Sequence, residues 1–304
     1  MKEVLIMSPE EAAKIFARLE ELVLDDSGIN RKYLNLSYGR DPNQTLDIYL
    51  PNEGAGPFPA VFFMHGGAWA MGDKRNPDLI PFIDGVMRGY AVISVNYRLT
   101  PYIRYPDNLF DVKAAIRWAA ENAETYLLDP SRVALAGASA GAHLAMMAAF
   151  TQGQAVFEES TPGETCRVLA VVDQVGPTDL GKMQSHYDES GYPRMQPPDP
   201  NVLNPYEIII GVKTDAVPNL LRFINPIDNV HPNIPPVFIQ HGKLDPVVPY
   251  QQSFELRDRI ISVAGPGMAE LDFLEDAPHV GPEFSSKESV DKIFSFLDRY
   301  MKQQ

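Results

Sequence analysis

The hydrophobic positions of this chain follow two different spacings along its length. Short continuous apolar runs are typical of strands that are buried on both faces of a sheet. Such runs recur at residues 60–64, 91–95, 133–136, 168–172 and 237–240. Residues 46–50 alternate like a half-exposed strand, and residues 271–274 add a last strand near the C-terminus.

Apolar residues at helical spacing fill the gaps between these runs. They predict helices over residues 106–124, 140–150, 250–263 and 285–300. Strands that alternate with helices predict a mostly parallel sheet with helices on both faces. We expect eight strands in this sheet, one more than the seven runs above. We expect a single α/β domain over residues 1–304.

Two segments depart from this alternation. The sequence from Ser8 to Glu11 combines a capping serine, a first-turn proline and a glutamate, which predicts a helix within an N-terminal extension of residues 1–30. Residues 178–235 are rich in proline, asparagine, aspartate and aromatic residues, with a short helical pattern at 217–223. A long irregular stretch in a compact domain is usually a lid or a binding loop. The alternative is a flexible insertion that the fold merely tolerates.

Composition narrows the classes of partner. The formal charge of −14 on 304 residues argues against nucleic acids and anionic membranes, because both repel an acidic surface. No stretch approaches the roughly 18 apolar residues that span a bilayer. The single cysteine, Cys166, cannot form an internal disulfide, so we expect a cytoplasmic protein, or a secreted one if a signal peptide preceded this sequence. The histidines are scattered without ligand spacing, so no metal and no cofactor is predicted. The oligomeric state stays open.

The sequence Gly137-Ala138-Ser139-Ala140-Gly141 matches G-x-S-x-G. A buried strand ends at it and a helix of small residues begins after it, which is the strand–turn–helix context that this motif requires. A strained turn there projects the serine hydroxyl from the sheet, and the flanking glycines let strand and helix approach closely. Ser139 is therefore the predicted nucleophile.

A second motif, His65-Gly66-Gly67-Ala68-Trp69, directly follows the strand at 60–64. Acyl transfer needs backbone N–H groups aimed at the developing oxyanion, and consecutive glycines let a backbone come close to it. The predicted donors are the N–H groups of Gly67 and Ala140, with Gly66 or Ala68 as a third. His65 is expected to brace this loop, and Trp69 either lines the acyl pocket or packs in the core.

A serine nucleophile needs a base, and the base needs an acid to orient it. The order expected on this fold is serine, then acid, then histidine. His279 follows the last strand and precedes the last helix, so it is the predicted base. Asp245, on the loop after residues 237–240, is the predicted acid, with Asp173 and Asp179 as alternatives. The remaining histidines after Ser139 are read as structural or as part of the insertion: His143, His186, His231 and His241.

Several stretches together resemble the α/β-hydrolase esterases of the BD-FAE-like and hormone-sensitive-lipase-like groups. They are TLDIYLP, AVFFMHGGAWAMGDK, YAVISVNYRLTP, DPSRVALAGASAGAHLAM, VGPTDL and HGKLDPVVP, and the resemblance runs from about Thr45 to the C-terminus. It implies an α/β-hydrolase fold, a triad of Ser139, Asp245 and His279, and an oxyanion site at Gly66, Gly67 and Ala140. Among substrate-binding residues we expect Trp69 and Pro177.

The sequence departs from this pattern in two places. The histidine loop, APHVGPEF, lacks the glycine that relatives often place beside the histidine. Gln174 stands where such relatives often carry an aromatic residue.

The predicted function is that of a serine carboxylesterase. The resemblance points to small esters, including acetyl or feruloyl esters of plant polysaccharides. The alternatives are a serine peptidase or an arylformamidase of the same fold, and a non-catalytic binding protein built on that fold.

Overall fold

A computed structural model of the chain describes residues 22–157, 166–191 and 202–302, together with Glu10, Ala13, Lys14, Ala17 and Arg18. The remaining residues of the predicted N-terminal helix lie outside this description. No helix in the described part is both long and apolar enough to cross a membrane.

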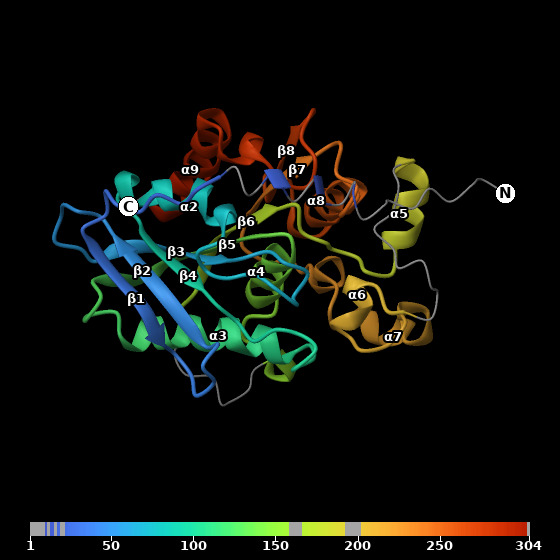
Figure 1. The fold of residues 1–304 in the computed structure, drawn as a ribbon, viewed down its shortest axis with the longest axis horizontal. Coiled ribbons are helices and arrows are strands. Elements are labelled where there is room, and N and C mark those ends of the chain that lie inside the picture. The colour runs from blue at the N-terminus through green and yellow to red at the C-terminus, as the bar shows by residue number, and fades with distance from the viewer. Residues whose placement is uncertain are drawn as a thin grey trace.

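Eight strands form one sheet in the order β1-β2-β4-β3-β5-β6-β7-β8 (Figure 1). β1 and β2 are antiparallel to their neighbours, and all strands from β4 to β8 in this order run parallel. The strands are β1 (Arg31–Ser37), β2 (Thr45–Leu50), β3 (Phe58–Met64), β4 (Ala91–Val95), β5 (Leu128–Ala138), β6 (Val168–Gln174), β7 (Val237–Gly242) and β8 (Ala269–Leu274).

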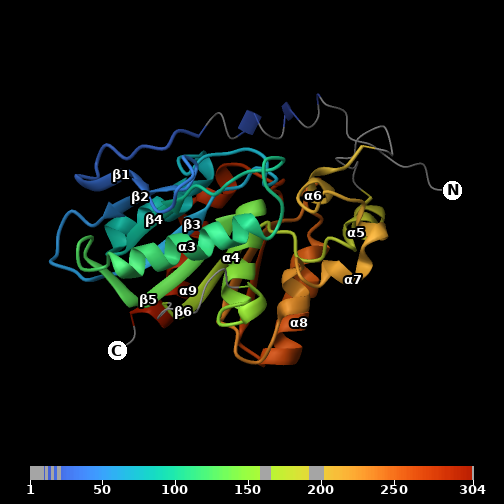
Figure 2. The ribbon, with the colours of Figure 1, turned by 90° about the horizontal axis from the view of Figure 1, so that it is seen from below.

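Helices cover both faces of this sheet, as Figure 2 shows for α3 and α4 on one face and α9 on the other. The helices are α2 (Ile80–Ile83), α3 (Asp107–Glu121), α4 (Ala140–Phe150), α5 (Met183–Ser190), α6 (Pro205–Ile208), α7 (Pro218–Leu221), α8 (Gln251–Ala264) and α9 (Lys287–Met301). Each face has its own hydrophobic core, because successive strand residues point to opposite faces. α4 is buried along its whole length, which explains its nearly continuous run of small and apolar residues.

The predicted parallel sheet and its flanking helices are confirmed, and so is the α/β-hydrolase fold. β1 has no counterpart among the predicted apolar runs. It is an edge strand whose residues are mostly exposed or half-buried, so its sequence carries no continuous apolar signal.

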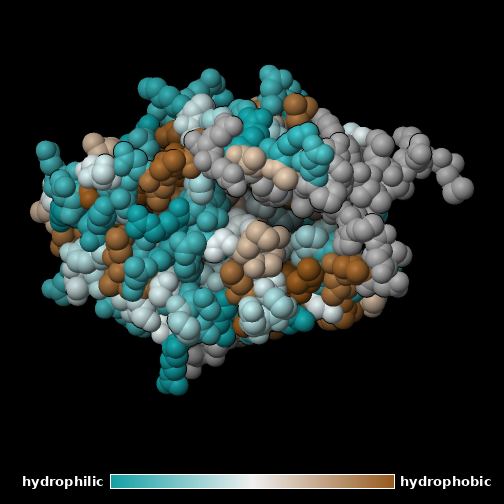
Figure 3. All heavy atoms as spheres, in the orientation of Figure 1, coloured by the Kyte–Doolittle hydropathy of each residue, from teal (hydrophilic) through white to brown (hydrophobic). Residues whose placement is uncertain are grey.

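The described residues of 178–235 contain α5, α6 and α7, together with the short 3-10 helices η4 (Thr214–Ala216) and η5 (Pro226–Asn229). These helices lie together at one end of the molecule in both ribbon views (Figures 1 and 2). The predicted helical pattern at 217–223 is realised only as α7, a single turn. Apolar side chains gather on the surface where Figure 1 places α6 and α7 (Figure 3). The exposed apolar residues of this segment include Val202, Val212 and Leu220.

Candidate active site

Ser139 stands at the sharp turn between β5 and α4. Its backbone has φ 52° and ψ −118°, a conformation that a non-glycine residue adopts only where the surrounding structure enforces it. Here the enforcement comes from close packing, because a Cβ on Gly141 would lie 2.0 Å from the Met64 carbonyl oxygen. The Ser139 N–H donates to the Gln174 carbonyl at 2.7 Å and so holds the turn against β6.

Three side chains that are distant in sequence form one hydrogen-bonded chain at this turn. The Ser139 hydroxyl lies 3.0 Å from Nε2 of His279, and Nδ1 of His279 lies 2.7 Å from Oδ2 of Asp245. A carboxylate only accepts hydrogen bonds, so Nδ1 carries the proton and Nε2 is free to accept one from serine. This arrangement can activate a hydroxyl as a nucleophile.

Asp245 is buried, and every oxygen of its carboxylate has partners. Oδ1 accepts the N–H groups of Val247 and Val248 at 2.8 and 2.9 Å, and Oδ2 also lies 3.1 Å from Nε2 of His241. Burial alone would raise the pKa of this carboxyl, but His279 and the hydrogen bond from His241 outweigh it and lower the pKa to about 2. The group therefore stays charged at neutral pH, as an orienting acid must.

The backbone N–H groups of the two predicted oxyanion donors, Gly67 and Ala140, have no hydrogen-bond partner among the described residues. Ala140 opens α4, where the first N–H groups of a helix have no intrahelical acceptor. Gly67 has φ 116°, and a Cβ there would lie 2.1 Å from the Met71 carbonyl oxygen, so this position requires glycine. Of the two candidates for a third donor, Gly66 already donates its N–H to Oδ2 of Asp78 at 2.7 Å, whereas no such bond is seen for Ala68 among the described residues.

Contacts of the His65 side chain hold the loop that carries these glycines. Nδ1 of His65 lies 2.7 Å from the Gly66 carbonyl, and the His65 ring stacks on Tyr97. Burial lowers the pKa of His65 to about 4, so this ring is neutral at physiological pH. Trp69 is buried, and its ring meets His143 edge to face. Pro177 is buried as well, three residues beyond the end of β6.

The alternative acids do not reach the base. The Asp173 carboxylate accepts the N–H of Gly176, and the Asp179 carboxylate accepts that of Gly181, while neither is hydrogen-bonded to His279. Among the other histidines, His143 contacts the Ile224 carbonyl at 2.7 Å and His231 contacts the Phe150 carbonyl at 3.0 Å.

Two further residues contact this site, His241 and Asp78. The sequence predicts a structural role for His241, and its spacing of four residues from Asp245 is the signal that could have indicated their contact. Asp78 follows Gly66 by twelve residues, in the short helix η1 (Pro77–Leu79), and no motif marks it. Only the folding of the loop brings its carboxylate to the Gly66 N–H.

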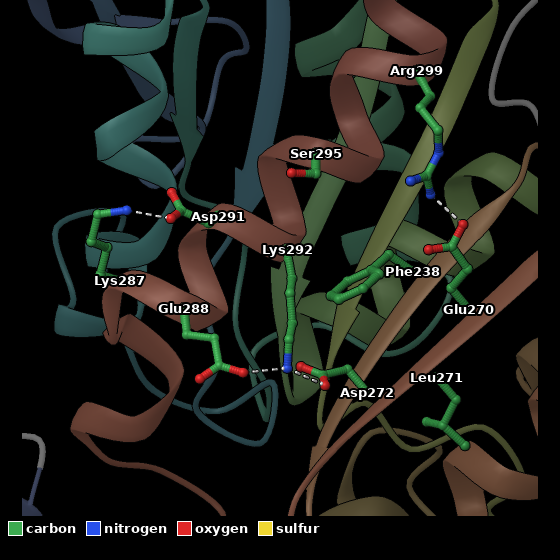
Figure 4. Close-up of a pocket in the computed structure, with 10 residues that line it drawn as sticks. All are labelled: Phe238, Glu270, Leu271, Asp272, Lys287, Glu288, Asp291, Lys292, Ser295 and Arg299. Atoms are coloured by element: carbon green, nitrogen blue, oxygen red, sulfur yellow. Dashed lines mark hydrogen bonds and ion pairs between the residues drawn. The ribbon is translucent and has the colours of Figure 1, made fainter.

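An open hollow of about 740 Å³ lies elsewhere, between β8 and α9 (Figure 4). Its charged groups pair with one another, for example Lys292 with Asp272 at 2.8 Å and with Glu288 at 3.0 Å. None of the three residues of the hydrogen-bonded chain lines this hollow.

The sheet order, the strained serine turn and the serine–histidine–aspartate chain define a protein of the α/β-hydrolase class. The chain belongs to the BD-FAE family, whose sequence profile matches residues 46–260.

Curated relatives of the chain are named as esterases. Esterase LipC of Mycobacterium tuberculosis is 32% identical over 80% of this chain, and the probable carboxylic ester hydrolase LipM of the same organism is 30% identical over 73%. The chain spans 59% and 50% of their lengths. Among solved structures, a truncated carbohydrate esterase from gut microbiota matches with a TM-score of 0.76 and 27% identity, over 92% of this chain and 99% of that one.

Proposed function

We propose that this chain hydrolyses carboxylic esters through an acyl-enzyme intermediate on Ser139. The observation that carries the proposal is the continuous hydrogen-bonded chain from the Ser139 hydroxyl through His279 to the buried Asp245 carboxylate. The esterase names of its relatives support the same activity.

In the first half-reaction Ser139 Oγ attacks the ester carbonyl carbon while Nε2 of His279 takes the hydroxyl proton. The carbonyl oxygen becomes an oxyanion, which the N–H groups of Gly67 and Ala140 stabilise. The intermediate then collapses, and the alcohol leaves with the proton from His279. In the second half-reaction a water molecule gives its proton to His279 and attacks the acyl carbon. The intermediate collapses, Ser139 Oγ leaves with the proton from His279, and the acid is released. Asp245 holds the imidazole in the required tautomer and stabilises its charged form throughout.

The test compares hydrolysis of p-nitrophenyl acetate and butyrate by the wild type, Ser139→Ala and a control, Ser262→Ala, whose side chain is exposed on α8. We expect loss of at least about three orders of magnitude in kcat for Ser139→Ala and none for the control. Activity that persists in Ser139→Ala would overturn the mechanism.

For the substrate we propose small or carbohydrate esters, including acetyl and feruloyl esters of plant polysaccharides. The BD-FAE membership supports this class, as does the likeness to a structure described as a carbohydrate esterase. A panel of acetyl, butyryl, longer-chain and feruloyl esters tests it. Aminoacyl-proline amides and N-formylkynurenine in the same panel test the peptidase and arylformamidase alternatives, and labelling by a fluorophosphonate tests whether the chain only binds.

We further propose that residues 178–235 form a cover over the site, with Trp69 and Pro177 in the wall beneath it. Three contacts that tie this segment to the site support the cover. His143, one helical turn after Ser139, bonds the Ile224 carbonyl, and the Tyr105 N–H bonds the Ile209 carbonyl. The Tyr187 hydroxyl donates to the carbonyl of Val247, two residues beyond Asp245. Replacing Trp69 by Ala should change the preference among acyl chains if the ring forms part of the pocket wall.

A further inference from the structure

One carboxyl group near the candidate active site has no part in the mechanism above. Asp78 lies in η1, and its Oδ2 accepts the Gly66 N–H at 2.7 Å. Its second oxygen, Oδ1, is buried and has no hydrogen-bond partner among the described residues. Burial raises the pKa of this carboxyl to about 6, although the Gly66 N–H lowers it in part. Burying a carboxyl oxygen without a hydrogen-bond partner lowers the stability of the fold. A carboxyl group kept in this state beside a reaction centre therefore indicates a role in that centre.

The position of Gly66 shows how close this carboxylate comes to the nucleophile. A Cβ placed on Gly66 would lie 3.2 Å from Oδ2 of Asp78 and 3.5 Å from Cβ of Ser139. The carboxylate and the serine therefore flank the same glycine. The side chains whose charge couples to Asp78 are His279, which lowers its pKa, and the phenol of Tyr97, whose own pKa it raises.

We propose that Asp78 is a positioning residue of the oxyanion loop and an electrostatic partner of His279. By binding the Gly66 N–H, the carboxylate fixes the peptide between His65 and Gly66. This sets the direction of the next peptide, so that the Gly67 N–H faces the oxyanion rather than turning away. Its negative charge also stabilises the imidazolium that His279 becomes during acylation. This proposal rests on the ester hydrolysis proposed above.

The hydrogen bond between Asp78 and the Gly66 N–H matters because the turn that follows Gly66 is strained. Ala68 and Trp69 both have positive φ, at 51° and 58°, so the loop needs outside contacts to hold this shape. A displacement of about 1 Å in a catalytic donor can lower the rate about 100-fold. An asparagine at position 78 keeps an oxygen that accepts the Gly66 N–H but removes the charge, so it separates the two roles.

The experiment measures kcat, KM and the pH dependence of kcat/KM on a short p-nitrophenyl ester. It uses the wild type, Asp78→Ala, Asp78→Asn and a control, Asp84→Asn, whose surface carboxylate pairs with Arg88. We expect kcat of Asp78→Ala to fall about 10- to 100-fold with KM within about twofold, because a donor is misplaced rather than binding lost. Asp78→Asn should recover at least about tenfold of that loss. It should also shift the acid limb of kcat/KM to lower pH by about half a unit, since the imidazolium has lost its partner.

Each result decides the proposal. A wild-type kcat for Asp78→Ala, or an acid limb that does not move in Asp78→Asn, overturns the corresponding role. If Asp78→Ala fails to fold by circular dichroism, both roles are read from Asp78→Asn alone: its acid limb should still shift, and a kcat more than about tenfold below wild type would overturn the positioning role. A wild type that hydrolyses no ester and is not labelled by a fluorophosphonate refutes the proposed function instead, whereas an active wild type with unchanged Asp78 variants refutes only this inference.

Discussion

The central strands and the segment 178–235 are stabilised in different ways. β3, β4, β6 and β7 are buried along nearly all of their length, and so is β5 from Val133 to its end. These strands pair with one another in parallel. The described residues of 178–235 also pack apolar side chains such as Ile209 and Ile224 in the core, but they pair with no strand of the sheet, and side chains hold their backbone at several points. Gln252 of α8 is the clearest example, because its side-chain oxygen accepts the N–H groups of Thr178 and Asp179 and its amide donates to the Asp179 carbonyl.

This difference in stabilisation matches what the serine turn and the proposed cover each require. The nucleophile turn needs a rigid frame, because strain at Ser139 persists only where packing enforces it. A substrate cover needs contacts that can open locally, and a few polar bonds have that property. The four predictions that follow test this contrast.

The largest loss of stability is expected at the turn between β5 and α4, where backbone packs closely on backbone. Gly141→Ala places a Cβ 2.0 Å from the Met64 carbonyl oxygen and 2.5 Å from that of His65, and these are backbone atoms that cannot rotate away as a side chain could. We expect the free energy of unfolding to fall by about 3 to 5 kcal/mol. Urea denaturation measures it, with Gly28→Ala as the control, because a Cβ there meets nothing within 4 Å. Equal urea midpoints for the two variants would show that the backbone around Gly141 can shift to make room for the added methyl group.

Gln252→Leu should loosen the start of the segment 178–235 without unfolding the sheet. It leaves the Thr178 and Asp179 N–H groups unsatisfied, at about 1 to 3 kcal/mol each. Limited proteolysis should cut within 178–235 faster, and Gln251→Leu is the matched control, since the side-chain oxygen of Gln251 has no partner among the described residues. If both variants resist the protease alike, the segment is held by something other than this amide.

The buried carboxyl of Asp173, in β6, makes the stability of the fold depend on pH. Burial raises the pKa of its carboxyl to about 7, above its value of about 3.9 in an unfolded chain, so folding favours the protonated form. Its contribution to stability is fully present below about pH 4 and is lost as the pH rises through about 7. Between pH 6 and 7 the wild type should lose at most about 1.4 kcal/mol that Asp173→Asn does not lose. Urea midpoints at the two pH values measure this, with the exposed Asp258→Asn as control.

The smallest effect is expected at the surface of the segment 178–235. Lys182 pairs with Glu255 at 2.7 Å, and the lysine side chain is half exposed. Such pairs contribute less than about 1 kcal/mol, so Lys182→Ala should leave both the melting temperature and the proteolysis pattern nearly unchanged. A loss of more than about 2 kcal/mol would make this ion pair part of the anchoring.

The parts of the fold that could be predicted have local signals. The runs at 60–64 and 91–95 are apolar because both faces of those strands are covered, and α4 begins at Ala140 as predicted because its small residues pack on the sheet. β1 escaped prediction because one side of an edge strand meets solvent. Asp78 escaped for a different reason: its contact with Gly66 spans a loop whose path depends on two left-handed residues, which no spacing rule anticipates.

The sequence by itself determined the class of fold and the candidate nucleophile, because strand–helix alternation and the G-x-S-x-G turn are written in neighbouring residues. It also ranked Asp245 and His279 through chain order. Only the tertiary structure decided which groups meet. Distances of 3.0 and 2.7 Å join residues that are 140 and 34 positions apart, and the Gly66 N–H is bound to Asp78. Hydrogen bonds act over about 3 Å, so they depend on where loops end in space rather than on the pattern that forms the strands and helices beneath them.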